Sequence, residues 1–375
     1  MTRLNGYRLD GAIRYHYGQF PPQHLDFARL MKPLGSTAAA LARYDALLRN
    51  LHNKDLLLAP LRRQEAVISS RIEGTVATLD EVLKFEAEKE NERQHHVRHE
   101  IIEVHSYSRA LTHAQNLMNG GLPICRRLIE QTHGKLLFLG RGADKQPGQF
   151  KRDQNYIVDK THKEVLFVPI SAEKLDDGIS VFEKFLHDEE VEPLIQTALS
   201  HAEFEALHPF KDGNGRMGRM LVTLFLWSRG LISDPHFYIS AAIEDRKEEY
   251  IDRLRSVSAD GQWTEWCIFF FQIIEAQAKS NVEIAEKIDA LYSEMKEKFR
   301  EVLASQWSIK ALDFIFGTPV FRNSTFTAKA GIPRQTAARF SRLLSDAGLL
   351  RIWVEPAGSR PSLLAFEPLL EIVRA

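Results

Sequence analysis

Cysteine is scarce in this chain, and no stretch is apolar enough to suggest a membrane span. Two cysteines occur among 375 residues, Cys125 and Cys267, far apart and without metal-ligand spacing. Their scarcity argues against a disulfide framework and favours a reduced compartment. The longest apolar stretches, LVTLFLW and CIFFFQII, are far shorter than the roughly 20 residues of a membrane span, and the first residues lack the apolar core of a secretion signal. We therefore expect a cytoplasmic protein that contacts no membrane.

A strong net charge is also absent. The chain has 49 Lys and Arg against 50 Asp and Glu, a formal charge of -1. The overall balance thus gives no reason to bind nucleic acid or an anionic membrane, and any basic patch must be local. What the chain does have is a hydrophobic fraction of 44%, which is enough to bury a core in two or three domains.

Helical periodicity dominates the sequence. Residues 36–58 repeat Leu and Ala at three- and four-residue spacing, which predicts an amphipathic helix. The segment GQFKRDQNYIVDKTHKEVLFVPI, residues 148–170, alternates apolar and polar residues around a turn-like DKTHK, which predicts a small β-hairpin. We expect no other strand pair in the first 300 residues. A charged helix over 276–305 is expected to lead to a separate C-terminal unit. The predicted fold class is mainly α with a small β-hairpin.

The stretch HPFKDGNGRMGR, residues 208–219, has the composition of a phosphate site. Pro209 disfavours helix at His208, so we expect one helix to end there. The apolar spacing after the loop predicts a second helix that begins at Asn214 or Gly215. The glycines would then lie at a helix N-terminus, where unpaired N–H groups and the positive end of the helix dipole favour an anion.

Four side chains of this stretch have the chemistry that a phosphate reaction needs. Arg216 and Arg219 can offer forked donors to phosphate oxygens. Asp212 can supply an oxygen to Mg²⁺, and His208 titrates near neutrality and can accept a proton from a hydroxyl. The stretch follows a predicted helix and matches neither a P-loop nor a Rossmann fingerprint.

HPFKDGNGR, extended to Arg219, resembles the Fic-domain signature His-Pro-Phe-x-Asp/Glu-Gly-Asn-Gly-Arg-x-x-Arg without departure at its defining positions. Most Fic proteins transfer AMP from ATP to a Ser, Thr or Tyr hydroxyl of a protein. The resemblance implies His208 as general base, Asp212 as Mg²⁺ ligand and Phe210 as a core residue that holds the loop. It implies that the phosphates of ATP are bound by Gly213, Asn214, Gly215, Arg216 and Arg219. The hairpin over 150–170 resembles the Fic flap, which aligns a target protein by main-chain pairing.

A second segment, SSRIEG at residues 69–74, resembles the inhibitory pattern Ser/Thr-x-x-x-Glu-Gly/Asn of the same family. The resemblance assigns Ser69, Glu73 and Gly74 to this motif. A carboxylate beside Arg219 would occupy donors that the γ-phosphate of ATP needs, so ATP would bind in an unproductive pose. We therefore expect a self-inhibited enzyme whose inhibitory helix precedes the catalytic loop.

The C-terminal residues predict a winged helix-turn-helix. The pattern gives a short helix, a turn at GIP, a second helix from Pro333 to Ala347 and two strands joined by EPAGSRP. Residues 308–375 contain nine basic and five acidic side chains. The second helix carries Arg334, Arg339 and Arg342, which could contact DNA, although many such modules bind protein instead.

These patterns divide the chain into four expected domains. They are an N-terminal helical region with the inhibitory motif, a Fic core, a helical linker and a winged helix, at 1–100, 101–275, 276–305 and 306–375. The leading hypothesis is a protein adenylyltransferase that uses MgATP and also modifies itself, with a homodimer as a further expectation. Two alternatives stay open: removal of AMP or another phosphate-linked transfer at the same site, and a DNA-binding regulator whose Fic domain is vestigial.

Overall fold

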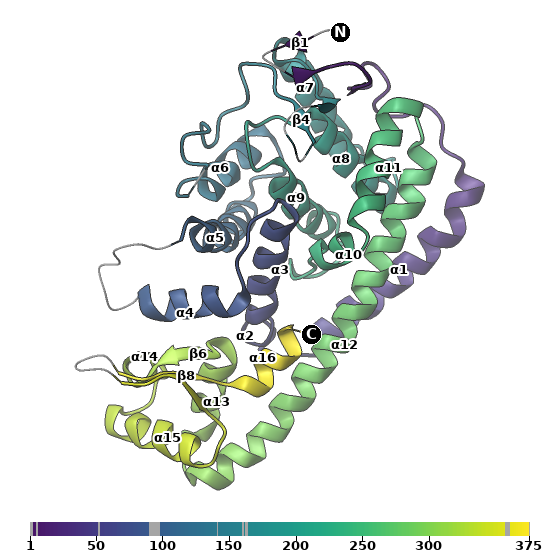
Figure 1. Cartoon of the computed structure of the whole chain (residues 1–375). Helices are drawn as coiled ribbons and strands as arrows, with labels where there is room; N and C mark the ends of the chain where they lie inside the picture. Colours follow the sequence, from purple (N-terminus) through teal and green to yellow (C-terminus); the bar gives the residue numbers. More distant parts are fainter. Residues whose placement is uncertain are drawn as a thin grey trace. The chain divides into compact units, whose positions relative to one another are not determined.

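The computed structural model describes residues 3–4, 7–51, 53–89, 98–140, 142–159, 161, 164–356 and 361–374. Within these ranges the chain is mainly helical with a few short strands (Figure 1), as the sequence predicts. It divides into two compact units. The first comprises Met1–Asp45, Ile68–Thr75 and Ser106–Lys279, and the second comprises Ala46–Val67, Val76–His105 and Ser280–Ala375. Each unit combines segments that are distant in sequence. The four consecutive domains expected above stay a prediction.

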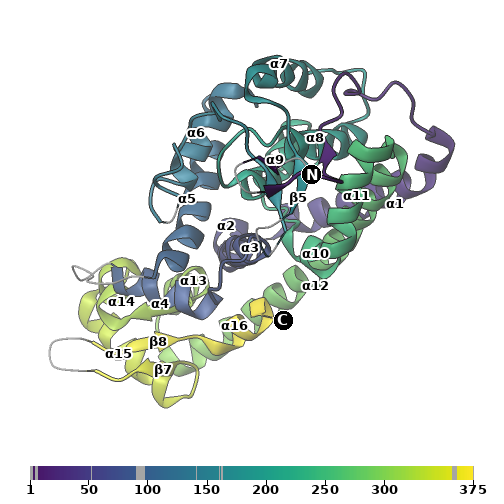
Figure 2. The same cartoon turned by 45° about the horizontal axis from the view of Figure 1, so that its top comes forward.

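The first unit is built around two buried helices. Its helices, whole or in large part, are α1 (Phe27–Asn50), α5 (His99–Asn119), α6 (Arg126–Leu136), η1 (Ala172–Lys174), α7 (Leu175–Leu186), α8 (Pro193–Leu207), α9 (Asn214–Ser228), α10 (Ser240–Asp245), α11 (Lys247–Asp260) and the first part of α12 (Trp263–Leu303). Nearly every residue of α8 and α9 is buried, as expected for helices that are apolar on most sides. Figures 1 and 2 show α5, α6, α7, α10 and α11 around them. The loop between α8 and α9 is therefore anchored in the core at both ends.

Five short strands also belong to the first unit: β1 (Arg3–Leu4), β2 (Tyr7–Arg8), β3 (Ile13–Arg14), β4 (Ile157–Val158) and β5 (Val165–Val168). β4 and β5 form the expected antiparallel pair; residues 160, 162 and 163 of its turn lie outside the described residues. The expectation of no other strand pair in this part of the chain is wrong. β1 pairs with β2, and β3 pairs in parallel with β5. Strands of two residues are too short to produce a detectable alternation.

The second unit contains the C-terminal elements and a helical segment from the N-terminal third. Its elements are α2 (Lys54–Leu57), most of α3 (Ala59–Ile72), α4 (Leu79–Lys89), the end of α12, α13 (Ser308–Gly317), β6 (Val320–Arg322), α14 (Asn323–Lys329), α15 (Arg334–Asp346), β7 (Arg351–Val354), β8 (Leu363–Ala365) and α16 (Glu367–Arg374). The three strands are antiparallel in the order β6-β8-β7. Asp80 and Glu88 of α4 form ion pairs with Arg374 and Arg322, at 2.7 and 3.4 Å. α4 thus belongs with the C-terminal elements.

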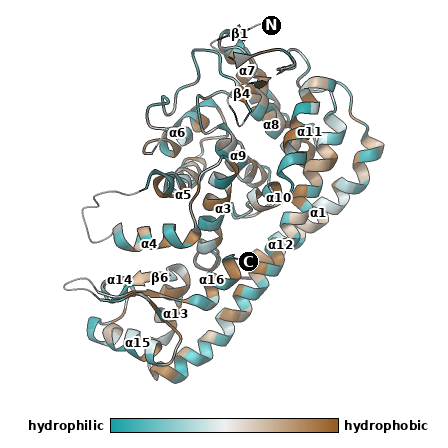
Figure 3. Cartoon of the chain, viewed as in Figure 1, coloured by the Kyte–Doolittle hydropathy of each residue, from teal (hydrophilic) through white to brown (hydrophobic). Residues whose placement is uncertain are grey.

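Helix α12 begins earlier than the charged helix expected over 276–305. It starts at Trp263, and Trp263 and Trp266 are buried, so its first turns belong to the core of the first unit. Figure 3 shows hydrophilic residues interspersed along the helices. No helix in the described ranges is both long and apolar enough to cross a membrane.

Candidate active site

His208, the first residue of the loop between α8 and α9, lies where helix α8 ends. His208 has φ 46° and ψ 59°, in the left-handed region, and its N–H donates to the carbonyl of Phe204 at 3.1 Å. It therefore closes α8 as a C-terminal cap. Pro209 follows and disfavours a helical conformation at His208. The helix ends at the position that the sequence predicts.

The ring of His208 is prepared to accept a proton at Nε2. Its Nδ1 lies 3.3 Å from the carbonyl oxygen of Glu205, and since a carbonyl only accepts, Nδ1 carries the hydrogen and Nε2 the lone pair. Desolvation lowers the pKa of His208 to about 4, and the charge of Lys151 acts in the same direction, against the opposing effects of the Glu205 carbonyl, Glu73 and Asp212. His208 is therefore neutral at pH 7 and has the protonation state of a general base.

Helix α9 starts at Asn214, within the predicted pair of positions. Gly213 precedes it with φ 77°, a conformation that glycine adopts without steric cost. The side chain of Asn214 binds the backbone of Phe210 twice: Phe210 N–H donates to Oδ1, and Nδ2 donates to Phe210 O, both at 2.9 Å. Phe210 is fully buried, in line with the role that the resemblance implies. The loop is thus folded onto the first turn of α9, and Gly213, the residue before that turn, has no side chain to cap it.

Asp212 and Arg216 lie at the same helix end. The Asp212 side chain is 43% exposed, and its Oδ1 lies 3.5 Å from Nη2 of Arg216. Among the described residues, no group of three or more His, Cys, Asp or Glu could hold a metal ion. Asp212 supplies one partly exposed carboxylate at this helix end. That donor set fits Mg²⁺, which is commonly held by one or two carboxylates together with substrate phosphates.

The segment 69–74 is in direct contact with Arg219, whose side chain is only 1% exposed. Nε of Arg219 donates to Ser69 Oγ at 2.9 Å, and Nη2 donates to Ser69 O and to Glu73 Oε1, each at 2.8 Å. Burial raises the pKa of Glu73, but the charge and hydrogen bond of Arg219, helped by Arg216 and His208, outweigh it and hold that pKa below its ordinary value. Glu73 is therefore ionised at neutral pH. Gly74, with φ 90°, follows directly.

Glu73 also lies against the first turn of α9. A Cβ added at Gly215 would overlap Oε1 of Glu73 and would come within 3.0 Å of Nη1 of Arg219. Glycine at 215 is therefore what allows the Glu73 carboxylate to approach the helix backbone. The structure brings together all the residues that the sequence singled out, from both segments.

Two further polar side chains of the site were not predicted. The ring of His133, on α6, stacks on Phe210 with centroids 3.5 Å apart; its Nδ1 accepts from Gly148 N–H and its Nε2 donates to Asp212 O, both at 2.9 Å. Burial lowers the pKa of His133 to about 4, so one neutral tautomer makes both bonds. Burial raises the pKa of Glu205 to about 8, so this carboxyl is protonated at pH 7. Both residues lie outside the two motifs, and no local pattern marks them.

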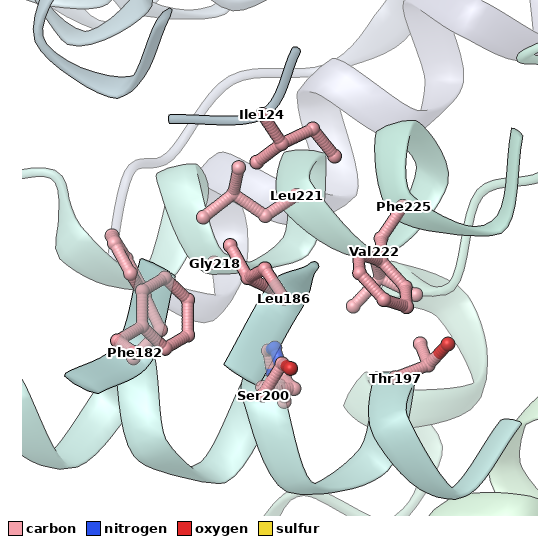
Figure 4. Close-up of a pocket in the computed structure, with 11 residues that line it drawn as sticks. Ile124, Phe182, Leu186, Thr197, Ser200, Gly218, Leu221, Val222 and Phe225 are labelled. Atoms are coloured by element: carbon pink, nitrogen blue, oxygen red, sulfur yellow. The ribbon is translucent and has the colours of Figure 1, made fainter. Parts of the chain in front are cut away.

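A small cavity lies between α7, α8 and α9. Figure 4 shows its lining, which is mostly apolar and includes Phe182, Leu186, Thr197, Ser200, Gly218, Leu221, Val222 and Phe225. Its volume of about 20 Å³ is enough for one water molecule and far too small for a nucleotide. The cavity is part of the helix packing and is not a substrate site.

Comparison with known families identifies both motif-bearing segments. The model described as Fic/DOC family N-terminal matches residues 31–116, and the model described as Fic/DOC family matches residues 123–226. Among curated relatives, Protein adenylyltransferase fic-1 of Caenorhabditis elegans is 28% identical over 95 residues, which are 24% of this chain and 17% of that protein. Protein adenylyltransferase Fic of Nematostella vectensis is 30% identical over 95 residues, 24% of this chain and 21% of that protein. The chain thus matches about a fifth of the length of these relatives.

Two solved structures share the fold. A Fic family protein from Desulfovibrio desulfuricans G20 superposes with a TM-score of 0.59 at 18% identity, covering 92% of this chain and 98% of that one. A Fic domain containing signaling protein from Bacteroides thetaiotaomicron VPI-5482 has a TM-score of 0.53 at 19% identity, covering 68% and 97%. Two matching family models and a common fold place the loop and the segment 69–74 in one known framework: the chain belongs to the Fic/DOC family.

Proposed function

We propose that the protein is a self-inhibited protein adenylyltransferase, which transfers AMP from MgATP to a Ser, Thr or Tyr hydroxyl of a protein. The observation that carries the proposal is the contact of the Glu73 carboxylate with Arg219, beside the first turn of α9. This helix end combines a helix N-terminus preceded by glycine, two arginines and a neutral histidine, which together suit a phosphate reaction. The names of the curated relatives agree with AMP as the transferred group.

In the proposed reaction, the target hydroxyl attacks the α-phosphate of ATP. A bond forms between the hydroxyl oxygen and Pα, the bond from Pα to the β-phosphate oxygen breaks, and pyrophosphate leaves. His208 accepts the hydroxyl proton at Nε2. Arg216 and the N–H groups at the start of α9 bind phosphate oxygens and stabilise the charge of the transition state. Asp212 would hold Mg²⁺, which neutralises phosphate charge when bound.

Inhibition would follow from competition for Arg219. Its Nη2 is shared between Ser69 O and Glu73 Oε1, and the carboxylate fills the space beside Gly215. A γ-phosphate needs the same donors, because both anions are recognised by the forked guanidinium. While Glu73 stays in place, the triphosphate is held away from the geometry in which Pα faces His208.

The flap would position the target. The sheet order β3-β5-β4 places β5 in the middle and leaves β4 at an edge. An extended target segment can add to such an edge through main-chain hydrogen bonds. The proposal therefore assigns target docking to β4, at Ile157–Val158, within the expected flap of 150–170.

The test is transfer of radiolabel from ATP labelled on the α-phosphate, with γ-labelled ATP in parallel, to the protein itself and to a lysate. The variants are wild type, Glu73→Gly and Glu73→Gly/His208→Asn; asparagine is chosen because it tolerates the left-handed conformation at 208. We expect α-label on protein mainly with Glu73→Gly, and its loss in the double variant. Transfer of γ-label alone would mean phosphorylation. Release of AMP from labelled protein, dependent on Glu73, would favour the removal reaction instead.

We also propose that residues 306–375 form a winged helix that contacts duplex DNA. The support is the element order α13, β6, α14, α15, β7, β8 and the exposure of Arg334, Arg339 and Arg342 on α15. Anisotropy with a pool of labelled duplexes at about 150 mM salt, where non-specific binding weakens, tests it. Binding without sequence preference, or binding that survives replacement of all three arginines by alanine, would refute a sequence-reading role.

A further inference from the structure

Two residues from outside the loop between α8 and α9 hold its backbone. Four successive carbonyls, those of residues 207 to 210, each accept a hydrogen bond from Lys151 or Asn155. Lys151 donates from Nζ to Leu207 O at 3.0 Å and from its backbone N to Pro209 O at 2.8 Å. Asn155 donates from Nδ2 to His208 O at 3.0 Å and to Phe210 O at 2.9 Å.

The two clamp residues, Lys151 and Asn155, also fix each other. Nζ of Lys151 donates to Oδ1 of Asn155 at 2.7 Å. The amide of Asn155 thus uses its oxygen for Lys151 and its two N–H groups for the two loop carbonyls, so only one orientation of the amide satisfies all three bonds. Lys151 is 3% exposed, which is unusual for lysine. Burial lowers the pKa of Lys151 to about 7.

The same segment leads directly into the flap. Asn155 lies two residues before β4 (Ile157–Val158), and Gln154 donates from Nε2 to Pro169 O, just after β5, at 3.1 Å. The edge strand and the backbone of His208 are therefore tied to one stretch of chain. A displacement of this stretch would move the target-docking edge and the base relative to each other.

We propose that Lys151 and Asn155 are positioning residues that fix His208 in register with the flap, so that the base meets the hydroxyl that the flap presents. This inference rests on the proposed function, because it assumes transfer to a flap-bound target. It adds to that function two residues whose hydrogen bonds described above go to each other and to the loop backbone. They act through the loop carbonyls, and their effect should fall on the chemical step and leave ATP binding intact.

The first experiment measures amide hydrogen exchange in the otherwise wild-type chain. Asn155→Asp is nearly isosteric but replaces the two donated N–H groups by an acceptor, and Lys151→Met removes the Nζ donor. We expect at least a tenfold faster exchange at the backbone amides of residues 151, 208 and 210 in both variants. Arg152→Met is the matched control, because Arg152 is exposed and lies beside the clamp; it should leave these amides unchanged.

The second experiment measures transfer in the Glu73→Gly background. Misplacement by about 1 Å can cost on the order of 10² in rate, so we expect kcat to fall about 10- to 100-fold in Asn155→Asp, with the Kd of a non-hydrolysable ATP analogue within about twofold. Lys151→Arg keeps a donor at this position, and should recover most of the rate that Lys151→Met loses. Circular dichroism confirms that each variant is folded.

The outcomes separate this inference from the proposed function. Unchanged exchange at the three amides overturns the clamp whatever the activity. Faster exchange with an unchanged kcat, or an equal loss of ATP affinity, overturns the positioning role. If Glu73→Gly transfers nothing, the proposed function fails, and the exchange data together with the ATP affinity still decide whether the two residues hold the loop without disturbing the nucleotide site.

Discussion

Release of Glu73 should be controlled in part by an ion pair next to it. Arg71, two residues before Glu73, donates from Nε and Nη2 to the two carboxylate oxygens of Glu244 on α10, both at 2.6 Å. The side chains are 51% and 28% exposed, so water screens the pair. Replacing Glu244 by Gln removes the charge and keeps the shape. If the inhibitory segment must leave this contact when it moves, the variant should be more active than wild type.

The size of the effect follows from the geometry. Exposed ion pairs contribute about 0.2 to 1 kcal/mol, and bidentate arginine pairs lie at the upper end. A stabilisation of about 1 kcal/mol corresponds to about a fivefold change in the population of the released state. We expect Glu244→Gln to raise the initial rate of α-label transfer two- to fivefold. The difference in initial rate between Glu244→Gln and wild type should become smaller as the salt concentration rises, since the Debye length falls to about 3 Å at 1 M.

A charge reversal supplies the control. Arg71→Glu and Glu244→Arg should each raise the rate, and the double variant should return it towards the wild-type value, because the pair is restored with opposite polarity. Rates of all four proteins are compared at equal ATP and at saturating Mg²⁺. Additive effects of the two reversals, or a single variant slower than wild type, would show that this contact does not restrain Glu73.

Three further predictions concern stability, measured by urea unfolding. Gly215→Ala should destabilise wild type, because its Cβ overlaps the Glu73 carboxylate. In the Glu73→Gly variant the same substitution should stabilise the protein by about 0.5–1 kcal/mol, the usual gain from alanine over glycine in a helix. A change in unfolding free energy of the same sign in both backgrounds would contradict this. Burial raises the pKa of Glu205 to about 8, so its contribution to stability is complete below the unfolded pKa and is lost as pH rises through 8. The free energy of unfolding of Glu205→Gln, relative to that of wild type, should therefore increase between pH 5 and 8.5. A difference that stays constant over this range would refute the burial argument. His133→Phe keeps the stacking but loses two buried hydrogen bonds, and should cost about 2–3 kcal/mol; a loss below about 0.5 kcal/mol would show that they contribute little.

The sequence predicted the local features of the site because its signals there are local. Pro209 disfavours helix at His208, which predicted the end of α8. The apolar spacing after the loop predicted the start of α9 at Asn214 or Gly215. The contact between Glu73 and Arg219 joins residues 146 positions apart. No physical property of the segment 69–74 indicates what it touches, and only its resemblance to a known motif predicted that contact. The homodimer stays a prediction.

The features that the sequence did not predict depend on tertiary structure. Lys151 lies in the polar run KRDQN, where composition predicts a solvated lysine; its burial follows from the array of loop carbonyls that it satisfies. His133 lies 75 residues before His208, and its partner ring and hydrogen bonds all come from other segments. Strand β3 has two residues and owes its conformation to β5. Such burial, ring contacts and strand pairing form only when segments distant in sequence pack together.

The left-handed backbone of His208 has a consequence for mutational scanning of this position. One residue both ends a helix and supplies the imidazole, so substitutions there should divide into two classes when abundance and activity are scored separately. Glycine and asparagine adopt φ 46° readily, and should give abundant, inactive protein. Valine, isoleucine and threonine, whose branched side chains resist that conformation, should lose abundance as well. At position 208 the abundance scores would then report tolerance of the backbone conformation, and the activity scores would report the need for the imidazole.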